Sequence, residues 1–238
     1  MSESIDCRID RILEQIHTSA QQAGRDRAHV QLELAVKTRT VNEIAQAVHA
    51  LNKRGQRAIL GQNRVQEAQV STPGLRDLGI ADFYPTLIGP LQKNKINHAL
   101  RVVEEIETLD TLKLAQAVAK RVEPGRVLNV MVQVNTARED TKSGVDPEHA
   151  LELAGAISEL PALHLVGFMT IGAHTDDETL VRRSFAQLRQ IRDAAVQQGL
   201  VDATELSMGM SGDFPLAIAE GATRVRIGSM AFGPRRVA

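Results

Sequence analysis

Several features that mark particular protein classes are scarce or missing in this sequence of 238 residues. Cysteine occurs once, as Cys7, which excludes an internal disulfide framework and favours a reducing compartment. The formal net charge is only −1, so nothing points to a partner made of nucleic acid or anionic lipid. No apolar run is long enough to span a membrane, and residues 1–24 lack the apolar block of a signal peptide. We therefore expect a soluble, cytoplasmic protein.

Metal-binding patterns are also missing. The seven histidines show no closely spaced ligand pair, and we predict no metal site. What the chain has instead is 43% hydrophobic and 24% charged residues, the ordinary balance of a globular protein with a substantial core.

The hydrophobic pattern switches repeatedly between a period of two and a period near 3.6, which is typical of alternating strands and helices. An amphipathic helix within residues 1–24 comes first, and Thr40 with Glu43 predicts a capping box after the first strand. Eight segments read as strands: 32–37, 57–61, 82–88, 101–109, 127–134, 163–171, 204–208 and 223–227. The fold class predicted is α/β, as one closed (β/α)8 TIM barrel over residues 1–238 with the N-terminal helix packed on it. The rival is an open doubly wound sheet, but its G-x-G-x-x-G fingerprint is absent.

Lys37 closes the apolar run of the first strand. A lysine in that place is costly unless it is solvated, paired or used, because its charged form resists desolvation. The carboxyl ends of barrel strands form the face where ligands bind, so its amine is a candidate covalent handle for a carbonyl compound. The alternative is a surface lysine with a buried stem.

Glycine-rich and serine-rich loops follow the last two strands. One contains Met210 and Ser211, and the other contains Gly228 and Ser229. In barrels these two loops commonly bind phosphate, because glycines let backbone amides approach it and serines donate hydroxyls. Each loop by itself could equally be an ordinary turn, and it is their pairing that favours phosphate.

Arg226 precedes Gly228 by two residues and should point into the mouth of the barrel, where a guanidinium can meet a ring nitrogen or a carboxylate. An amine, a phosphate site and an arginine between them describe the binding of an aromatic phosphate that carries an aldehyde. That molecule is pyridoxal 5′-phosphate (PLP).

In these features the chain resembles the pyridoxal phosphate homeostasis protein family, whose barrel is similar to the N-terminal domain of fold-type III alanine racemases. The resemblance covers nearly the whole chain and rests on the segments Leu34–Thr38, Gly61–Glu67, Ile88–Lys95, Lys142–Gly144, Gly167–Ile171, Ser207–Ser211 and Arg226–Ser229.

The resemblance implies a role for each site residue. Lys37 forms the internal aldimine, Arg226 faces the pyridine nitrogen, Ser211, Gly228 and Ser229 hold the phosphate, and Asn63 and Met210 lie near the cofactor. Two positions differ from the family's pattern. Gln62 stands where glutamate is usual, and Thr86 stands where the family has a histidine that could stack on the ring.

The resemblance also implies a PLP carrier in vitamin B6 homeostasis without catalytic turnover. A racemase needs acid/base groups on both faces of the substrate's α-carbon, and the second comes from a C-terminal β domain that we expect to be missing here. The alternatives are a weak amino-acid racemase using Lys37 as its only base, and a lysine-dependent aldolase without cofactor. We expect PLP as the small-molecule partner, PLP-dependent apoenzymes as recipients, and a monomer or weak dimer.

Strand parity adds two structural predictions. Glu33 and Arg224 lie on the inner faces of neighbouring strands, the first and the eighth, so we expect an ion pair low in the barrel. Asn135 should reach the same rim as Lys37.

Overall fold

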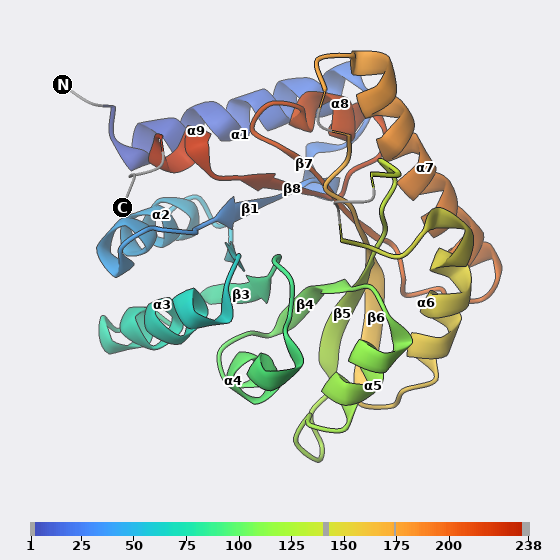
Figure 1. Ribbon diagram of the computed structural model, residues 1–238. Coiled ribbons are helices and arrows are strands. Elements are labelled where there is room, and N and C mark those ends of the chain that lie inside the picture. Colours follow the sequence, from blue (N-terminus) through green and yellow to red (C-terminus); the bar gives the residue numbers. More distant parts are fainter. Residues whose placement is uncertain (1–2, 140–142, 174, 235–238) are drawn as a thin grey trace.

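The computed structural model describes residues 3–139, 143–173 and 175–234. Eight parallel strands form a closed barrel in chain order, and helices surround it (Figure 1). The strands are β1 (Gln31–Ala35), β2 (Ala58–Gln62), β3 (Phe83–Leu87), β4 (Glu105–Leu109), β5 (Leu128–Gln133), β6 (Leu163–Met169), β7 (Glu205–Met210) and β8 (Arg224–Ile227). The predicted TIM-barrel fold is confirmed.

Helices follow the strands around the outside. They are α1 (Ile5–Gln22), α2 (Val41–Asn52), α3 (Val65–Asp77), α4 (Ile96–Leu100), α5 (Leu112–Ala119), α6 (Ala150–Ser158), α7 (Glu178–Gln197), α8 (Phe214–Ala219) and α9 (Ser229–Phe232), with short 3-10 turns at Arg27–His29, Lys93–Lys95 and Pro147–His149. Among the residues that the structure describes, no helix is both long and apolar enough to cross a membrane.

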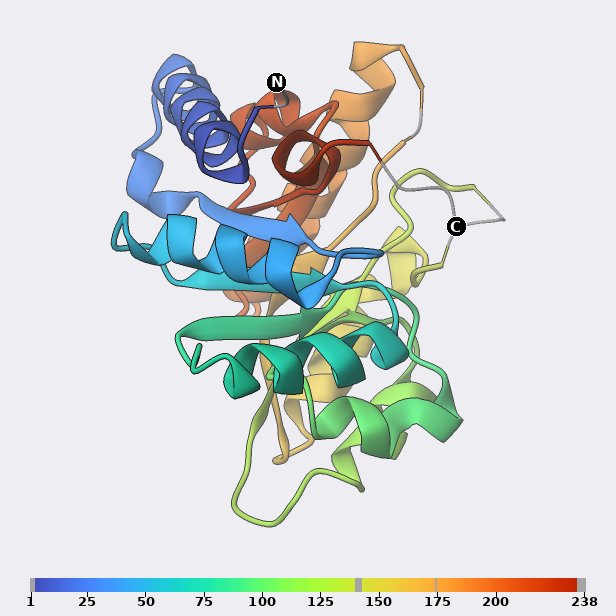
Figure 2. The same cartoon turned by 90° about the vertical axis from the view of Figure 1, so that its left-hand side faces the viewer.

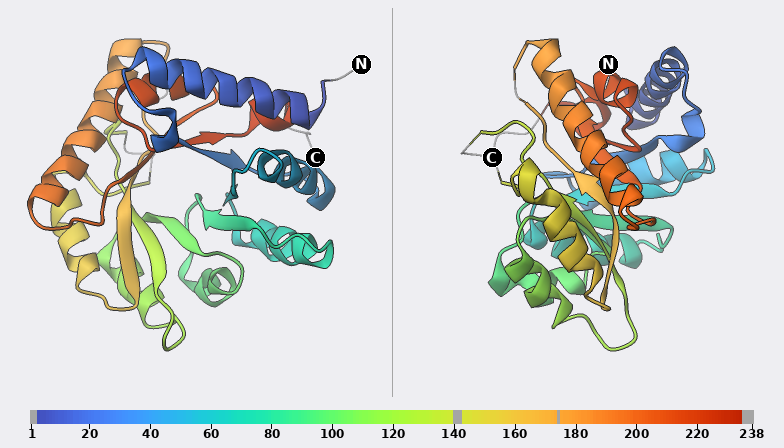
Figure 3. Two further views of the ribbon diagram at one scale, coloured as in Figure 1. Left: turned by 180° about the vertical axis from the view of Figure 1, so that it is seen from behind. Right: turned by 90° about the vertical axis from the view of Figure 1, so that its right-hand side faces the viewer.

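The N-terminal helix α1 lies on the outside of the barrel, against α2, α8 and α9 (Figure 3). Ser4 caps its first turn by accepting a hydrogen bond from the Cys7 amide, and Ile9, Ile12 and Ile16 are fully buried. The helix therefore covers the seam where β8 meets β1, which buries apolar surface that would otherwise face water.

Local sequence signals predicted where most helices and strands begin. The capping box at Thr40 and Glu43 is present: the threonine hydroxyl accepts from the Glu43 amide, and the Glu43 carboxylate accepts from the Thr40 amide. Every strand lies within or close to its predicted range, and β1 ends at Ala35 rather than at Lys37.

The fourth strand differs most from its prediction. It begins at Glu105 rather than at residue 101, because the amides of Val102 and Val103 donate to the Ala99 carbonyl and prolong the turn of α4. The helix that follows is capped by Thr111, whose hydroxyl accepts from the Leu114 amide.

The strands all run toward one end of the barrel, and the view from the side shows β1 pointing to the end from which the loop after β5 extends (Figure 2). That end is the carboxyl face on which TIM barrels carry their ligand sites.

Candidate functional site

Lys37 lies two residues beyond β1, in a turn at the carboxyl end of the barrel. The next residue, Thr38, has φ of +61°, a left-handed conformation that a β-branched residue adopts only under strain. This turn presents the half-buried Lys37 to a cavity of about 370 Å³.

The ends of six strands and the loops that follow them line this cavity, which we call the carboxyl-end cavity. Its lining consists of Ala35, Lys37, Arg39, Gly61, Asn63, Ile88, Met169, Ile171, Met210, Ser211, Gly212, Arg226, Gly228 and Ser229. All seven predicted cofactor residues are among them, although they come from segments as far apart as Lys37 and Ser229. The structure thus brings the predicted set together in one place.

The two glycine-rich loops border the cavity through Met210, Ser211, Gly228 and Ser229. Gly209 has φ of +90°, and the Met210 amide that follows it donates to the Asp213 carboxylate at 2.6 Å. Gly228 lies so close to the end of β1 that a Cβ atom added to it would sit 3.2 Å from the Ala35 carbonyl oxygen. A side chain here would crowd the strand that leads to Lys37, so glycine keeps the two segments adjacent.

Arg226 lies on the cavity floor and is only 4% exposed. Its Nη1 donates to the Ser207 hydroxyl at 2.7 Å, and its Nη2 donates to the Thr170 carbonyl at 2.6 Å. Two acceptors on β7 and at the end of β6 therefore fix the plane of the guanidinium.

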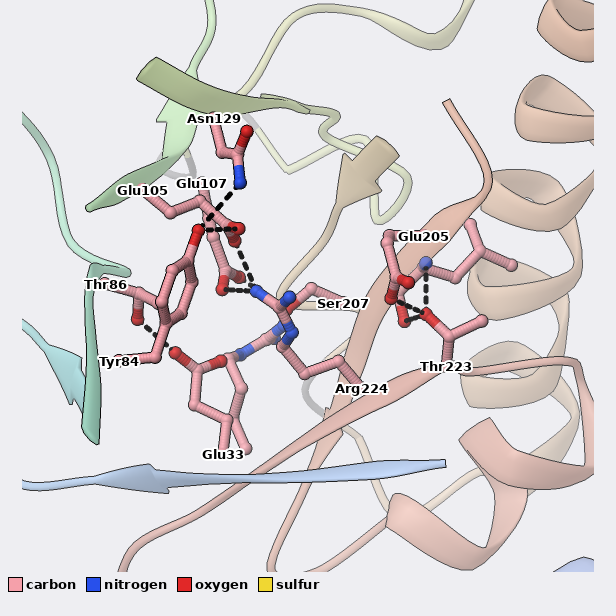
Figure 4. A network of polar contacts seen from close by, with 12 residues as sticks. Glu33, Tyr84, Thr86, Glu105, Glu107, Asn129, Glu205, Ser207, Thr223 and Arg224 are labelled. Atoms are coloured by element: carbon pink, nitrogen blue, oxygen red, sulfur yellow. Dashed lines mark hydrogen bonds and ion pairs between the residues drawn. The ribbon is translucent and has the colours of Figure 1, made fainter. Parts of the chain in front are cut away.

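Below this floor the barrel interior is filled by a network of polar side chains, drawn in Figure 4. Ser207 donates to Glu107 at 2.5 Å, and Arg224 donates to Glu107 at 2.8 Å and also to Glu105. Tyr84 donates to Glu105 at 3.2 Å. Charges buried at this depth are tolerated because they are paired and hydrogen-bonded.

The predicted ion pair between Glu33 and Arg224 is wrong. Both side chains do face the interior, but Arg224 pairs with Glu105 and Glu107, and the Glu33 carboxylate accepts from the Thr86 hydroxyl. The reason is the register of β1 and β8, which places Gln31 beside Arg224 and Glu33 beside Arg226, so the two predicted partners are displaced by two residues along the strands. Arg224 on β8 instead meets Glu105 on β4, and Glu33 on β1 meets Thr86 on β3.

Burial shifts the pKa values of these carboxyls. Burial, helped by the nearby Glu107, holds the pKa of Glu33 well above its usual range, against the opposing effect of Arg224. Burial also raises the pKa of Glu105 to about 7, even though Arg224 acts in the other direction. Both carboxyls consequently hold their protons more tightly than a solvated glutamate.

The two positions that depart from the family's pattern are both buried and both bonded. Thr86 is occupied by its bond to Glu33, and Gln62 donates to the Ser71 hydroxyl at 2.7 Å. Neither lines the carboxyl-end cavity. Thr86 instead belongs to the polar layer beneath it.

Asn135 is not at this cavity. It lies two residues beyond β5, at the same carboxyl end of the barrel as Lys37, but its side-chain amide donates to the Glu139 carbonyl at 3.0 Å and so braces the loop after β5. Lys142, part of one family-like segment, lies outside the described residues.

Sequence reasoning missed several residues of the lining. Arg39 donates to the Gly233 carbonyl at 2.7 Å and lies over the Phe232 ring, so it ties the Lys37 turn to the segment after β8. Ile88 and Ile171 supply apolar wall. Each follows the end of a strand, and the two isoleucines also lie in segments that carry the family resemblance; these were the sequence signals that could have identified them.

A larger cavity of about 670 Å³ opens at the opposite end of the barrel. Tyr84, Glu105 and Arg224 form part of its lining, and none of the predicted cofactor residues does. The only tyrosine of the chain therefore belongs to the end away from Lys37.

Comparison with known proteins gives a consistent result. The family model described as "Alanine racemase, N-terminal domain" matches residues 8–236. Curated pyridoxal phosphate homeostasis proteins are 37% identical in Aquifex aeolicus, over 96% of this chain and 97% of theirs, and 40% identical in Helicobacter pylori strain J99, over 94% and 96%. A solved structure of PipY from Synechococcus elongatus with PLP bound has a TM-score of 0.78 at 33% identity and covers 93% of this chain and 100% of its own. The relatives cover nearly all of this chain and of their own length, and the fold and the motif segments of this chain point to the same family. The chain therefore belongs to the pyridoxal phosphate homeostasis protein family.

Proposed function

We propose that this protein binds PLP reversibly in the carboxyl-end cavity, with Lys37 as the covalent anchor, and serves vitamin B6 homeostasis as a carrier. The observation that carries the proposal is the convergence of all seven predicted residues on one cavity. The bound PLP in the structure of PipY supports the choice of ligand.

The chemistry of the lining fits this cofactor. When bound, PLP supplies an aldehyde, with which a lysine amine condenses with loss of water. Lys37 is the lysine of the cavity lining, and Arg226 offers a fixed positive charge and N–H donors toward a ring nitrogen. Ser211 and Ser229, with the backbone amides of the two glycine-rich loops, suit a phosphate.

The walls fit an aromatic ring even though Thr86 leaves no histidine to stack on it. Ile88, Met169, Ile171 and Met210 line the cavity with apolar surface. Methionine and isoleucine side chains pack against ring faces through dispersion, and these contacts are less directional than aromatic stacking. We propose that Asn63 and Met210 contact the ring from these walls.

A carrier fits the site better than an amino-acid racemase does. Racemisation needs a second acid/base group beside the lysine, and Tyr84 lines the other end of the barrel. Burial and the neighbouring Glu105 also raise the pKa of Tyr84, so its phenol stays protonated and is not available as a base.

We further propose a cytoplasmic location, PLP-dependent apoenzymes as recipients, and a monomer or weak dimer. The exposed free thiol of Cys7 supports a reducing compartment. Sedimentation of the purified protein at several concentrations tests the oligomeric state.

The proposal is tested by the absorption spectrum of the protein after incubation with PLP and removal of excess cofactor. The wild type should show the visible band of a lysine-bound cofactor, and borohydride should fix the pyridoxyl group on the peptide that contains Lys37. The Lys37→Ala variant should lose both signals. Lys53→Ala, which changes an exposed lysine at the far end of α2, should keep them. A wild type without the band, or a label confined to other lysines, contradicts the proposal.

A further inference from the structure

Arg226 donates a hydrogen bond to one side chain that takes no part in the proposed contacts with PLP. This side chain is Ser207, which is fully buried on β7 and accepts the Nη1 hydrogen bond of Arg226 at 2.7 Å. The other acceptor is a backbone carbonyl, that of Thr170, whose position cannot be changed by a side-chain substitution. Of the two acceptors, the Ser207 hydroxyl is thus the one that a substitution can remove.

The direction of these hydrogen bonds is fixed by Glu107. A serine hydroxyl has one proton, and Ser207 donates it to the Glu107 carboxylate at 2.5 Å. Only the lone pairs of the Ser207 oxygen then remain for Arg226. Glu107 is itself anchored by Arg224 at 2.8 Å, so the chain of bonds ends on a second buried cation (Figure 4).

This series of hydrogen bonds affects the carboxyl-end cavity. A carboxylate that polarises a hydroxyl strengthens the bond that the hydroxyl accepts. The negative charge of Glu107 in this way strengthens the bond between Ser207 and Arg226, so that the guanidinium keeps one orientation in the lining of the cavity. Without Ser207, the guanidinium would keep the Thr170 bond and could turn about it.

We propose that Ser207 is a positioning residue for the cofactor: it couples Glu107 to Arg226 and holds the guanidinium in the orientation that the ring of PLP requires. This inference rests on the proposed function, because it assumes that Arg226 faces bound PLP. It assigns to Ser207 no contact with the cofactor itself.

The test compares Ser207→Ala with Thr223→Val. Thr223 also donates to a glutamate, Glu205, at 2.5 Å, and accepts from the Leu206 amide at 2.8 Å, but it lies apart from the Arg224 cluster and lines no part of the carboxyl-end cavity. Both variants remove a hydroxyl from a bond to a carboxylate, so both should lower thermal stability. Only Ser207→Ala should weaken PLP binding, by about tenfold and mainly through faster release.

Glu107→Gln supplies a second readout that does not depend on how well Ser207→Ala folds. The amide retains an oxygen that can accept from Ser207 but removes the negative charge behind Arg226. The pH at which the visible band of the bound cofactor changes should fall by about half a unit or more, since a lost negative charge disfavours protonated forms nearby.

The outcomes separate this inference from the proposed function. If the wild type binds no PLP, the proposed function fails and the inference with it. If the wild type binds PLP, and Ser207→Ala matches Thr223→Val in affinity and release while Glu107→Gln keeps the wild-type pH profile, then Ser207 is merely structural and the inference is overturned. Tenfold weaker binding in Ser207→Ala alone, with the shifted profile in Glu107→Gln, supports it.

Discussion

Replacing Glu105 by glutamine should change the pH dependence of stability in a direction that the structure specifies. Glu105 is buried on the inner face of β4, where it accepts hydrogen bonds from Arg224 and Tyr84. Burial raises the pKa of its carboxyl from 4.5 to about 7, so burial outweighs the attraction of Arg224. The folded protein therefore holds a proton that the unfolded chain has already released.

The sign and size follow from this difference in proton binding. A carboxyl whose pKa is raised on folding stabilises the fold at low pH, and that contribution is lost as the pH rises from 4.5 toward 7. Between pH ~5 and pH ~8 the loss amounts to roughly 2–3 kcal/mol for this group. Glutamine resembles the protonated carboxyl and does not titrate. The stability of Glu105→Gln relative to the wild type should consequently increase by roughly 2–3 kcal/mol across that range.

Urea unfolding without PLP, followed by circular dichroism at half-unit steps of pH, measures this difference directly. Glu104→Gln is the matched control, since Glu104 is the preceding residue and its carboxylate is exposed beside Arg57. If the stability difference between Glu105→Gln and the wild type stays constant from pH ~5 to pH ~8, then Arg224 keeps Glu105 ionised throughout. That result would refute the reasoning that burial dominates here.

Two backbone positions near the carboxyl-end cavity give further predictions. Thr38→Asn should raise stability by about 1 kcal/mol in urea unfolding, because Thr38 is exposed at φ of +61° and asparagine tolerates that conformation; a loss of stability would show that Thr38 is not strained. Gly89→Ala should lower stability by about 1–3 kcal/mol and displace Asn63, since its Cβ would lie 2.0 Å from the Asn63 carbonyl oxygen. Gly155→Ala on α6 is its control, with no atom within 4 Å of the added Cβ and an expected gain of about 0.5 kcal/mol, and equal effects of the two changes would contradict the clash.

Much of the candidate site could be predicted because its signals are local. Lys37 ends the apolar run that contains β1, and the last two strands are followed at once by Ser211 and by Gly228 and Ser229, so each residue is tied to the end of its own strand. A closed parallel barrel brings all strand ends to one face. Once the order of strands and helices indicated that fold, the convergence of these residues on one cavity followed from topology.

The sequence by itself determined the order of the elements, the barrel, the family and the set of residues at its carboxyl end, because hydrophobic period, caps and motifs depend on residues that are close in the chain. Only the tertiary structure decided which buried charges meet. Arg224 reaches across the barrel to Glu105 and Glu107, in a part of β4 where the pairing with β5 shifts register between Ile106 and Leu109. Such pairings depend on the layer in which each inner side chain lies, and layer and register are set by the closed barrel as a whole, not by any one strand.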